Sequence, residues 1–214
     1  MKIQVEALNK TFRGVQVLED INYTFTSGKI YGLAGKNGSG KTMLLREIAG
    51  LIHPTSGRVL IDGKQLHRDL SFPPSMGLII EKPEFLGDMS GFENLKMLAG
   101  IRKTVTDDQI KAWMRRFALD PEAKQPMRKY SLGMKQKIGI IQAVMEDPEL
   151  LILDEPFNAL DEESVRLCWS ILQALQQTDK LIIITSHHKE DIEQLCDHTL
   201  LMEGGRLAGH FGMT

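Results

Sequence analysis

The sequence Gly35-Lys36-Asn37-Gly38-Ser39-Gly40-Lys41-Thr42 matches the pattern G-x-x-x-x-G-K-[ST], in which a glycine-rich loop binds phosphate. Glycines let such a loop curl until successive backbone N–H groups face one anion, and the dipole of the next helix adds to the attraction. The Lys41 ammonium is then positioned for the β- and γ-phosphates of a nucleotide, and the Thr42 hydroxyl for Mg²⁺. We therefore predict that this stretch binds nucleotide phosphates.

The neighbouring residues support this prediction. Residues 29–34 have the pattern of a strand and residues 43–49 that of a helix, so the glycine-rich stretch lies where the phosphate-binding mechanism requires it. A chance match is expected on the order of once in a hundred chains of this length, and the placement makes it rarer still. We assign the nucleotide contacts here to Gly35, Lys36, Asn37, Gly38, Ser39, Gly40, Lys41, Thr42 and Met43.

Two carboxylates follow an apolar strand further along the chain, in Leu150-Leu151-Ile152-Leu153-Asp154-Glu155-Pro156. Ligands of open α/β sheets bind at the edge where such strands end. Asp154 suits a water-mediated contact to Mg²⁺, which keeps much of its hydration, and Glu155 suits polarising the water that attacks a γ-phosphate. A strand ending in two solvated acids is the simpler interpretation of this segment alone, and the upstream phosphate loop makes the catalytic one preferable.

A second apolar strand ends in Thr185-Ser186-His187-His188. We predict that His187 contacts the γ-phosphate or orients the attacking water, because it lies one residue past Ser186 at a strand end. A lone histidine is more often an ordinary surface or core residue. That interpretation is kept for the other histidines, which are His53, His67, His188, His198 and His210.

The order of patterns along the chain indicates an α/β protein. Period-2 alternation predicts strands within residues 3–25, with turns at residues 13–14 and 27–28. Strand and helix patterns alternate again from residue 148, which is typical of a mostly parallel sheet. Between them, residues 88–147 have helical spacing and few β-branched runs, and we interpret them as a helical insertion into that core.

The composition of the chain limits the classes of function that need to be considered. The chain has 214 residues, 42% hydrophobic and 25% charged, with a net charge of −2, as in an ordinary globular protein. Since no overall basic field is present, nucleic acid is not expected as a partner. Cys168 and Cys196 lack metal-ligand spacing, and we expect two buried thiols in a reducing cytosol.

Membrane-spanning and targeting patterns are not found in the sequence. Charged residues at positions 2 and 6 interrupt the start, and apolar runs such as residues 181–184 fall far short of the ~20 residues that span a bilayer. If the protein works at a membrane, we expect a partner to supply the membrane part. The chain ends soon after residues 204–208, and we expect no appended regulatory domain.

Taken together, these motifs resemble the ABC ATPases over essentially the whole chain and in the family's order. The stretches that carry the resemblance are similar to Walker A (residues 35–42), the signature (Tyr130-Ser131-Leu132-Gly133-Met134-Lys135-Gln136-Lys137), Walker B (residues 154–156), the D-loop (residues 158–161) and the switch histidine (His187). A signature placed ahead of Walker B separates this family from other phosphate-loop proteins.

The resemblance implies a fold and a site. The expected fold is a single ABC ATPase domain over residues 1–214, a P-loop NTPase with a RecA-like core. That core and an N-terminal antiparallel β-subdomain would occupy residues 1–87 and 148–214, and the helical subdomain residues 88–147. Phe12 would stack on adenine, Asp161 would belong to the nucleotide site, and Thr42, Glu81 and Asp154 would hold Mg²⁺.

The resemblance also implies an assembly. Two subunits, as a homodimer or with a second ABC ATPase, would close head to tail over two ATP molecules. Ser131 and the N–H of Gly133, at a helix N-terminus, would cap the γ-phosphate held by the other subunit. An integral membrane permease would dock through the segment after residue 81 and hold the protein on the inner, cytoplasmic face of the membrane.

The sequence departs from the family pattern at two positions. Leu132 replaces the first signature glycine, which reduces backbone freedom there, and we expect a working but altered cap. Glu81 stands where most relatives have glutamine; it still offers Mg²⁺ an oxygen ligand but adds negative charge near the triphosphate. Glu81, with the following Pro83-Glu84-Phe85 and Phe92-Glu93-Asn94-Leu95, resembles the subfamily that serves bacitracin and lantibiotic self-protection or related peptide export. We hypothesise that Glu81 couples Mg²⁺ occupancy to the partner.

We therefore predict an ATP-hydrolysing subunit that powers an ABC exporter of peptide antibiotics or drugs. The alternative is a soluble ABC ATPase in cofactor assembly, translation or DNA maintenance. Translation-type relatives usually join two cassettes, and DNA-maintenance relatives carry a long coiled coil, neither of which this sequence has. A binding module without hydrolysis is disfavoured because Glu155 and His187 are both present.

Overall fold

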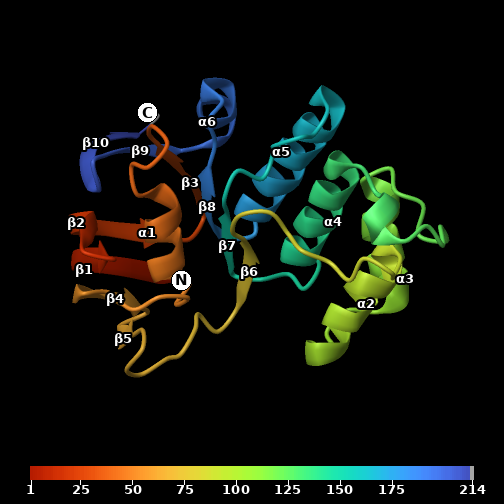
Figure 1. Ribbon diagram of the computed structural model, residues 1–214, viewed down its shortest axis with the longest axis horizontal. Helices are drawn as coiled ribbons and strands as arrows, with labels where there is room; N and C mark the ends of the chain where they lie inside the picture. The colour runs from red at the N-terminus through yellow and green to blue at the C-terminus, as the bar shows by residue number, and fades with distance from the viewer. Residues whose placement is uncertain (213–214) are drawn as a thin grey trace.

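The computed structural model of the protein describes residues 1–212, which fold into two β-sheets and six α-helices (Figure 1). In chain order the elements are β1 (Lys2–Phe12), β2 (Val15–Thr26), β3 (Lys29–Ala34), α1 (Lys41–Ile48), β4 (Ser56–Ile61), β5 (Lys64–Gln65), β6 (Met76–Ile79), α2 (Gly91–Arg102), α3 (Asp107–Arg116), a 3-10 turn (Met127–Lys129), α4 (Leu132–Val144), β7 (Leu150–Leu153), α5 (Glu162–Gln176), β8 (Leu181–Thr185), α6 (Lys189–Leu195), β9 (His198–Glu203) and β10 (Arg206–Gly212).

The larger sheet has the strand order β10-β9-β3-β8-β7-β6. Five of these strands, β9, β3, β8, β7 and β6, run parallel, and β10 pairs antiparallel with β9 at one edge. The carboxyl ends of the parallel strands therefore meet at one edge of the sheet, which is where α/β proteins place their ligands. The smaller sheet is antiparallel, in the order β2-β1-β4-β5.

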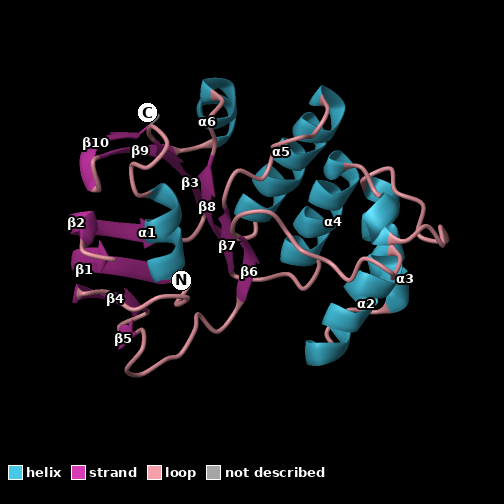
Figure 2. Cartoon of the chain, viewed as in Figure 1, coloured by secondary structure: helices cyan, strands magenta, loops and turns pink. Residues whose placement is uncertain are grey.

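Two apolar cores cover the two faces of the larger sheet. Strands β7 and β8 are buried at every residue, which explains why both are continuous apolar runs. The first core contains alternate residues of these strands with apolar residues of α2 to α6, and the second contains the other residues with α1 and the smaller sheet. Figure 2 shows the larger sheet between the smaller sheet and the group formed by α2, α3 and α4.

Side-chain caps explain where several helices begin. The side chains of Ser90, Thr106, Ser131 and Asp161 each accept a hydrogen bond from the backbone N–H three residues later, at the starts of α2, α3, α4 and α5. Helix α1 is different, because its N-cap is Gly40, which has no side chain to cap the first turn. The first turn of α1 is therefore left open to an external anion.

Most of the predicted architecture is confirmed. The sheet is mostly parallel, an antiparallel sheet lies at the N-terminus, and Cys168 and Cys196 are buried free thiols. The strands predicted within residues 3–25 are two long ones, β1 and β2, which stay continuous because bulges let them bend without breaking. Helices α2, α3 and α4 all fall within residues 88–147, and the division into a core and a helical subdomain stays a proposal.

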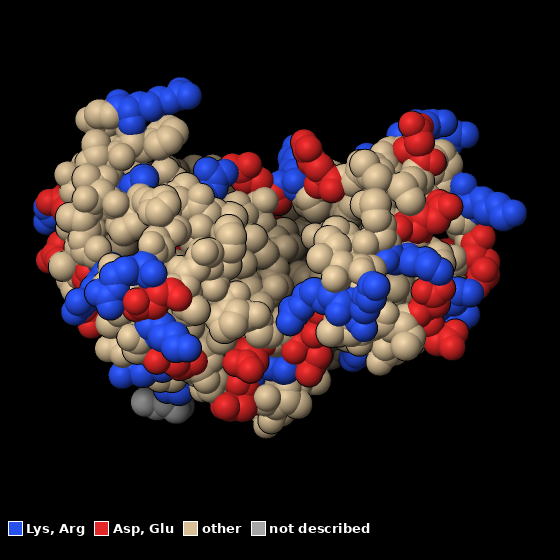
Figure 3. All heavy atoms as spheres, turned by 90° about the horizontal axis from the view of Figure 1, so that it is seen from below, with Lys and Arg blue, Asp and Glu red and all other residues tan. Residues whose placement is uncertain are grey.

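Further features of the molecule are the distribution of charged side chains on one face and the lengths of its helices. On the face in Figure 3, Lys and Arg side chains are interspersed with Asp and Glu side chains. Among the described residues, 1–212, no helix has the length and apolar character needed to cross a bilayer.

Glu47 on α1 is a fully buried carboxyl, and neither of its oxygens accepts a hydrogen bond within residues 1–212. Burial raises the pKa of Glu47 to about 7, although Lys10, whose Nζ lies 3.9 Å from Oε1, acts in the opposite direction. The folded protein therefore binds a proton more tightly than the unfolded chain, and stability falls as pH rises from about 4.5 to about 7.

We expect Glu47→Gln to remove most of this pH dependence. The variant should match the wild type near pH 4.5 and exceed its free energy of unfolding by up to about 3 kcal/mol at pH 8. Urea unfolding at several pH values measures this. Glu203→Gln, at an exposed strand end, is the control and should leave the profile unchanged. Parallel profiles for wild type and Glu47→Gln would contradict the prediction.

Candidate active site

The glycine-rich loop connects β3 to α1 at the carboxyl edge of the larger sheet. Gly40 has a φ of 103°, and a Cβ there would lie 2.9 Å from the carbonyl oxygen of Val17, so both conformation and space require glycine. Lys41 Nζ donates hydrogen bonds to the carbonyl oxygens of Gly35 (2.7 Å) and Lys36 (3.2 Å). The ammonium is therefore held against the loop that is predicted to bind phosphate.

Asp154 connects three elements through its carboxylate. It follows β7, is only 7% exposed, and accepts hydrogen bonds from the hydroxyls of Thr42 on α1 (2.7 Å) and Thr185 on β8 (2.6 Å). The Thr185 hydroxyl also accepts a hydrogen bond from the backbone N–H of Glu155 (2.8 Å). A buried carboxylate needs such partners, so these bonds fix Asp154 and Glu155 relative to the phosphate loop.

Glu155 and His187, which follow the ends of two neighbouring strands, are in direct contact. His187 Nε2 lies 3.0 Å from Glu155 Oε1, and the His187 backbone N–H donates to Glu155 Oε2 at 3.2 Å. Burial raises the pKa of Glu155 above its ordinary value, and the adjacent His187 opposes this shift. A carboxylate with a raised pKa is a stronger base than an ordinary one, which suits activation of a water molecule.

The donor set fits a nucleotide with Mg²⁺. The Thr42 hydroxyl and the Asp154 carboxylate meet at 2.7 Å, and oxygen ligands of these kinds are the ones that Mg²⁺ prefers. The hydroxyl of Ser39, in the loop, is buried and has no hydrogen-bond partner within residues 1–212. An orphaned donor beside an open helix N-terminus is what a phosphate oxygen would satisfy.

One cavity of about 280 Å³ contains most of the predicted site. Its lining residues are Val17, Asn37, Gly38, Ser39, Gly40, Lys41, Thr42, Met43, Asp154, Glu155 and His187. All of them except Val17 were predicted from the sequence. Val17 lies on β2, and only the fold of the smaller sheet brings it to the loop.

Seven other predicted residues do not line this cavity, namely Phe12, Gly35, Lys36, Glu81, Ser131, Gly133 and Asp161. Phe12 ends β1 and is 49% exposed, and Asp161 caps α5 by accepting from the Ser164 N–H at 2.8 Å. Ser131 caps α4 by accepting from the Met134 N–H at 3.1 Å. The nucleotide contacts assigned to Phe12, Asp161, Ser131 and Gly133 stay predictions.

The signature segment is tied to the segment after β7 by two contacts that the sequence did not reveal. Gln136 on α4 donates to the carbonyl oxygen of Pro156 at 2.8 Å, and the Gln136 side chain is buried. A Cβ on Gly133 would lie 2.7 Å from the carbonyl oxygen of Ala159, so the helix approaches closely only because glycine is present. Leu132, by contrast, is exposed.

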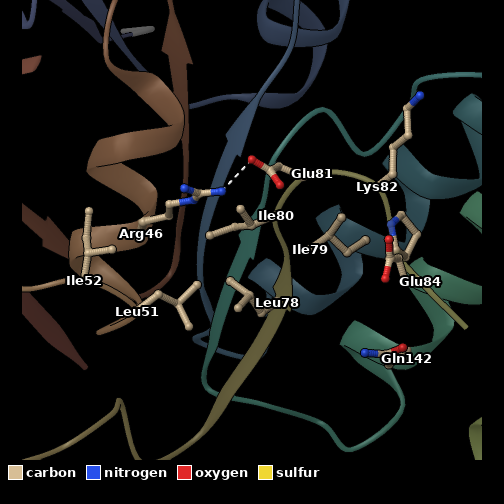
Figure 4. Close-up of a pocket in the computed structure, with 11 residues that line it drawn as sticks. Arg46, Leu51, Ile52, Leu78, Ile79, Ile80, Glu81, Lys82, Glu84 and Gln142 are labelled. Atoms are coloured by element: carbon tan, nitrogen blue, oxygen red, sulfur yellow. Dashed lines mark hydrogen bonds and ion pairs between the residues drawn. The ribbon is translucent and has the colours of Figure 1, made fainter. Parts of the chain in front are cut away.

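Glu81 lies at the same sheet edge but its carboxylate points toward α1. It follows β6 and shares a second cavity of about 280 Å³ with Asp154 and Glu155. Its Oε1 accepts from Arg46 Nη2 at 2.5 Å, and the two side chains point toward each other in Figure 4. The predicted Mg²⁺ contact of Glu81 therefore stays a prediction, and Arg46 is a neighbour that no sequence pattern indicated.

Comparisons with known proteins agree with this geometry. The family model described as ABC transporter matches residues 18–158. An ABC transporter ATP-binding protein of Bacillus subtilis, YybJ, is 50% identical over 96% of this chain and 94% of its own length. The bacitracin transport ATP-binding protein BcrA of Enterococcus faecalis is 38% identical over 96% of this chain and 67% of its own. The lantibiotic transport ATP-binding protein SrtF of Streptococcus pyogenes is 31% identical over 96% and 88%.

Solved structures give the same fold. An ATP-binding subunit of an ABC transporter superposes with a TM-score of 0.89 at 25% identity, covering 100% of this chain and 90% of that one. The ATP-binding cassette MJ0796, in a dimeric post-hydrolysis state with ADP and phosphate, has a TM-score of 0.88 at 17% identity and covers 99% of both chains. These likenesses confirm the predicted fold class.

Thr185 provides a test of the site. We expect Thr185→Val, which keeps the shape but removes the hydroxyl, to lower the rate of ATP hydrolysis about 10- to 100-fold, because Asp154 and Glu155 each lose a hydrogen bond. Steady-state kinetics measure this, with circular dichroism to check the fold. Thr178→Val is the matched control, since its hydroxyl is exposed at the end of α5. An equal decrease of the hydrolysis rate in both variants would contradict the assignment of Thr185 to the positioning of Asp154 and Glu155.

Proposed function

This chain belongs to the ABC transporter family as one of its ATP-binding proteins, and we propose that it powers peptide-antibiotic or drug export by an integral membrane permease. It binds ATP with Mg²⁺ and hydrolyses it, working in a dimer with a permease partner, as ATP-binding subunits of this family do. The class of cargo is proposed from the bacitracin and lantibiotic transport proteins among its relatives. The cytoplasmic face of the membrane is the proposed location.

One observation supports the catalytic part of the proposal above all others. A single cavity contains the phosphate loop, two carboxylates with different surroundings and a histidine in contact with one of them. Phosphoryl transfer depends mainly on positioning and on stabilising charge, and this arrangement provides both.

Each residue of the cavity has a proposed part. The Lys41 ammonium would bind the β- and γ-phosphates, and α1 would present its open N-terminus to the same charge. Thr42 and Asp154 would hold Mg²⁺, directly and through water. When bound, the ion neutralises charge that develops on the phosphates.

Glu155 is proposed as the base and His187 as its orienting partner. The Glu155 carboxylate is largely buried and contacts both the ring and the backbone N–H of His187, so its direction is fixed. A fixed carboxylate with a raised pKa can orient a water molecule and accept its proton. His187 is partly exposed at the cavity and can also contact the γ-phosphate.

A second subunit would complete the site. Ser131 and Leu132 are exposed at the N-terminus of α4, outside the phosphate cavity of their own chain. We propose that they cap the γ-phosphate in the other subunit of a head-to-tail pair, formed by two copies or with a second ABC ATPase. Gly133 packs on Ala159 and would present its N–H to the same anion.

The permease would dock beside Glu81. A cavity of about 430 Å³ lies between α1, β6 and α4 and is lined by Arg46, Leu51, Ile52, Leu78, Ile79, Ile80, Glu81, Lys82, Pro83, Glu84 and Gln142 (Figure 4). Leu51, Phe72 and Leu86 are exposed apolar side chains, which would be covered in a complex. Residues 82–84 of this lining belong to the segment after residue 81 that the sequence indicated for the partner.

The base assignment can be tested by substitution. We expect Glu155→Gln to bind ATP about as tightly as the wild type, to hydrolyse it at least 100-fold more slowly and to accumulate as an ATP-bound dimer. Single-turnover hydrolysis and size-exclusion chromatography with ATP measure these effects. Lys41→Ala should be at least as damaging to hydrolysis, because it removes phosphate binding as well. Unchanged turnover in Glu155→Gln would mean that another group is the base.

The transport assignment is tested by isolating the protein from its native cell. We expect a multi-span membrane protein to co-purify in about stoichiometric amount after tagging and gentle solubilisation. Mass spectrometry identifies the partner, and the Arg46-lined cavity predicts that it cross-links near Leu51 or Leu86. A soluble complex without a membrane protein would contradict the transporter assignment and leave the ATP chemistry intact.

A further inference from the structure

Glu81 occupies an unusual position on the surface of the site. Its backbone has a φ of 62°, in the left-handed region that residues other than glycine adopt less readily. Its side chain is 65% exposed, so burial does not hold it. The ion pair with Arg46 is the contact that the structure provides for this carboxylate.

Arg46 lies on the same helix as the predicted Mg²⁺ ligand Thr42, four residues later. Residues four apart lie on one face of a helix, separated by about one turn, or roughly 5–6 Å. Thr42 is in hydrogen-bonding contact with Asp154 at 2.7 Å, and Arg46 holds Glu81 at 2.5 Å. The Glu81 carboxylate is therefore tied to the helix that carries Thr42, and Glu81 lines one cavity together with Asp154 and Glu155.

We propose that Arg46 is a positioning residue that competes with Mg²⁺ for the Glu81 carboxylate and thereby sets the Mg²⁺ concentration at which the ATP site is complete. This inference rests on the proposed function and on the prediction, made from the sequence, that Glu81 is a further Mg²⁺ ligand. A glutamine at position 81 could accept a hydrogen bond from Arg46, but it would carry no negative charge to attract the guanidinium. The competition between Arg46 and Mg²⁺ therefore depends on the glutamate found here.

The strength of the ion pair suits a reversible role. Both side chains are partly exposed. The free energy of such an exposed ion pair is small and changes an equilibrium constant by no more than about fivefold. Mg²⁺ can therefore displace Arg46, at a measurable cost in affinity. Arg46 also lines the cavity proposed for the permease, so a docked segment would contact the guanidinium that restrains Glu81.

The test measures Mg²⁺ binding without hydrolysis. The purified protein is saturated with a non-hydrolysable ATP analogue, and its thermal midpoint is recorded against free Mg²⁺. We expect Arg46→Met, which keeps the aliphatic stem, to lower the Mg²⁺ concentration for half-maximal stabilisation about twofold to fivefold. Arg46→Lys should restore the wild-type value. Arg58→Met is the matched control, because it removes an exposed ion pair with Glu6 in the smaller sheet and should change nothing.

A double-mutant cycle separates competition from simple charge repulsion. In the Glu81→Gln background, Arg46→Met should leave the Mg²⁺ dependence unchanged, because the carboxylate for which Arg46 competes is gone. The same shift in both backgrounds would mean that Arg46 only repels the cation, and it would overturn the inference. The inference would also be overturned if Arg46→Met alone left the Mg²⁺ concentration for half-maximal stabilisation unchanged. If the wild type gained no stability from the analogue at any Mg²⁺ concentration, the proposed ATP site itself would be wrong.

Discussion

The buried carboxylate of Asp154 is the group on which the arrangement of the site depends. A charge that is 7% exposed loses most of its hydration, and the loss is offset only where hydrogen-bond donors replace water. The two hydroxyls that do so come from α1 and from the end of β8, so their bonds join the phosphate loop, β7 and β8 at one point. The backbone N–H of Glu155 donates to the same Thr185 hydroxyl, so the hydroxyl that supports Asp154 also positions the proposed base.

The packing of the larger sheet explains why the chemistry lies at its edge. Strands β7 and β8 contribute side chains to both cores, one on each face of the sheet, and every residue in them is buried. Charged groups cannot be accommodated within such strands, so they appear where the strands end and water is reached. Because the strands are parallel and adjacent, their ends coincide. The apolar runs and the carboxylates that follow them are therefore two consequences of one burial pattern.

The sequence predicted those parts of the site that a short continuous stretch encodes. The phosphate loop, the carboxylates after β7 and His187 each follow a local pattern, and all three lie in one cavity. What it could not predict are contacts between distant residues. Thr185 is hydrogen-bonded to Asp154 across 31 positions of the sequence. The hydrogen bonds from Gln136 to Pro156 and from Arg46 to Glu81 cross 20 and 35 positions. A threonine at the end of an apolar strand has no pattern of its own, and only the strand order brings it to the carboxylate.

Helix α4 joins two surfaces that the proposed function keeps separate. Ser131 and Leu132 lie at its N-terminus, where the second subunit would be met, and Gln142 lines the cavity proposed for the permease. A helix of 13 residues is about 20 Å long, so its two ends can take part in different surfaces. Its N-terminal turn is also bound to the segment after β7, through Gln136 and through the close approach of Gly133 to Ala159. Movement of α4 by a docked partner would therefore displace the signature and strain the segment that carries Glu155, which provides a physical route between membrane partner and ATP site.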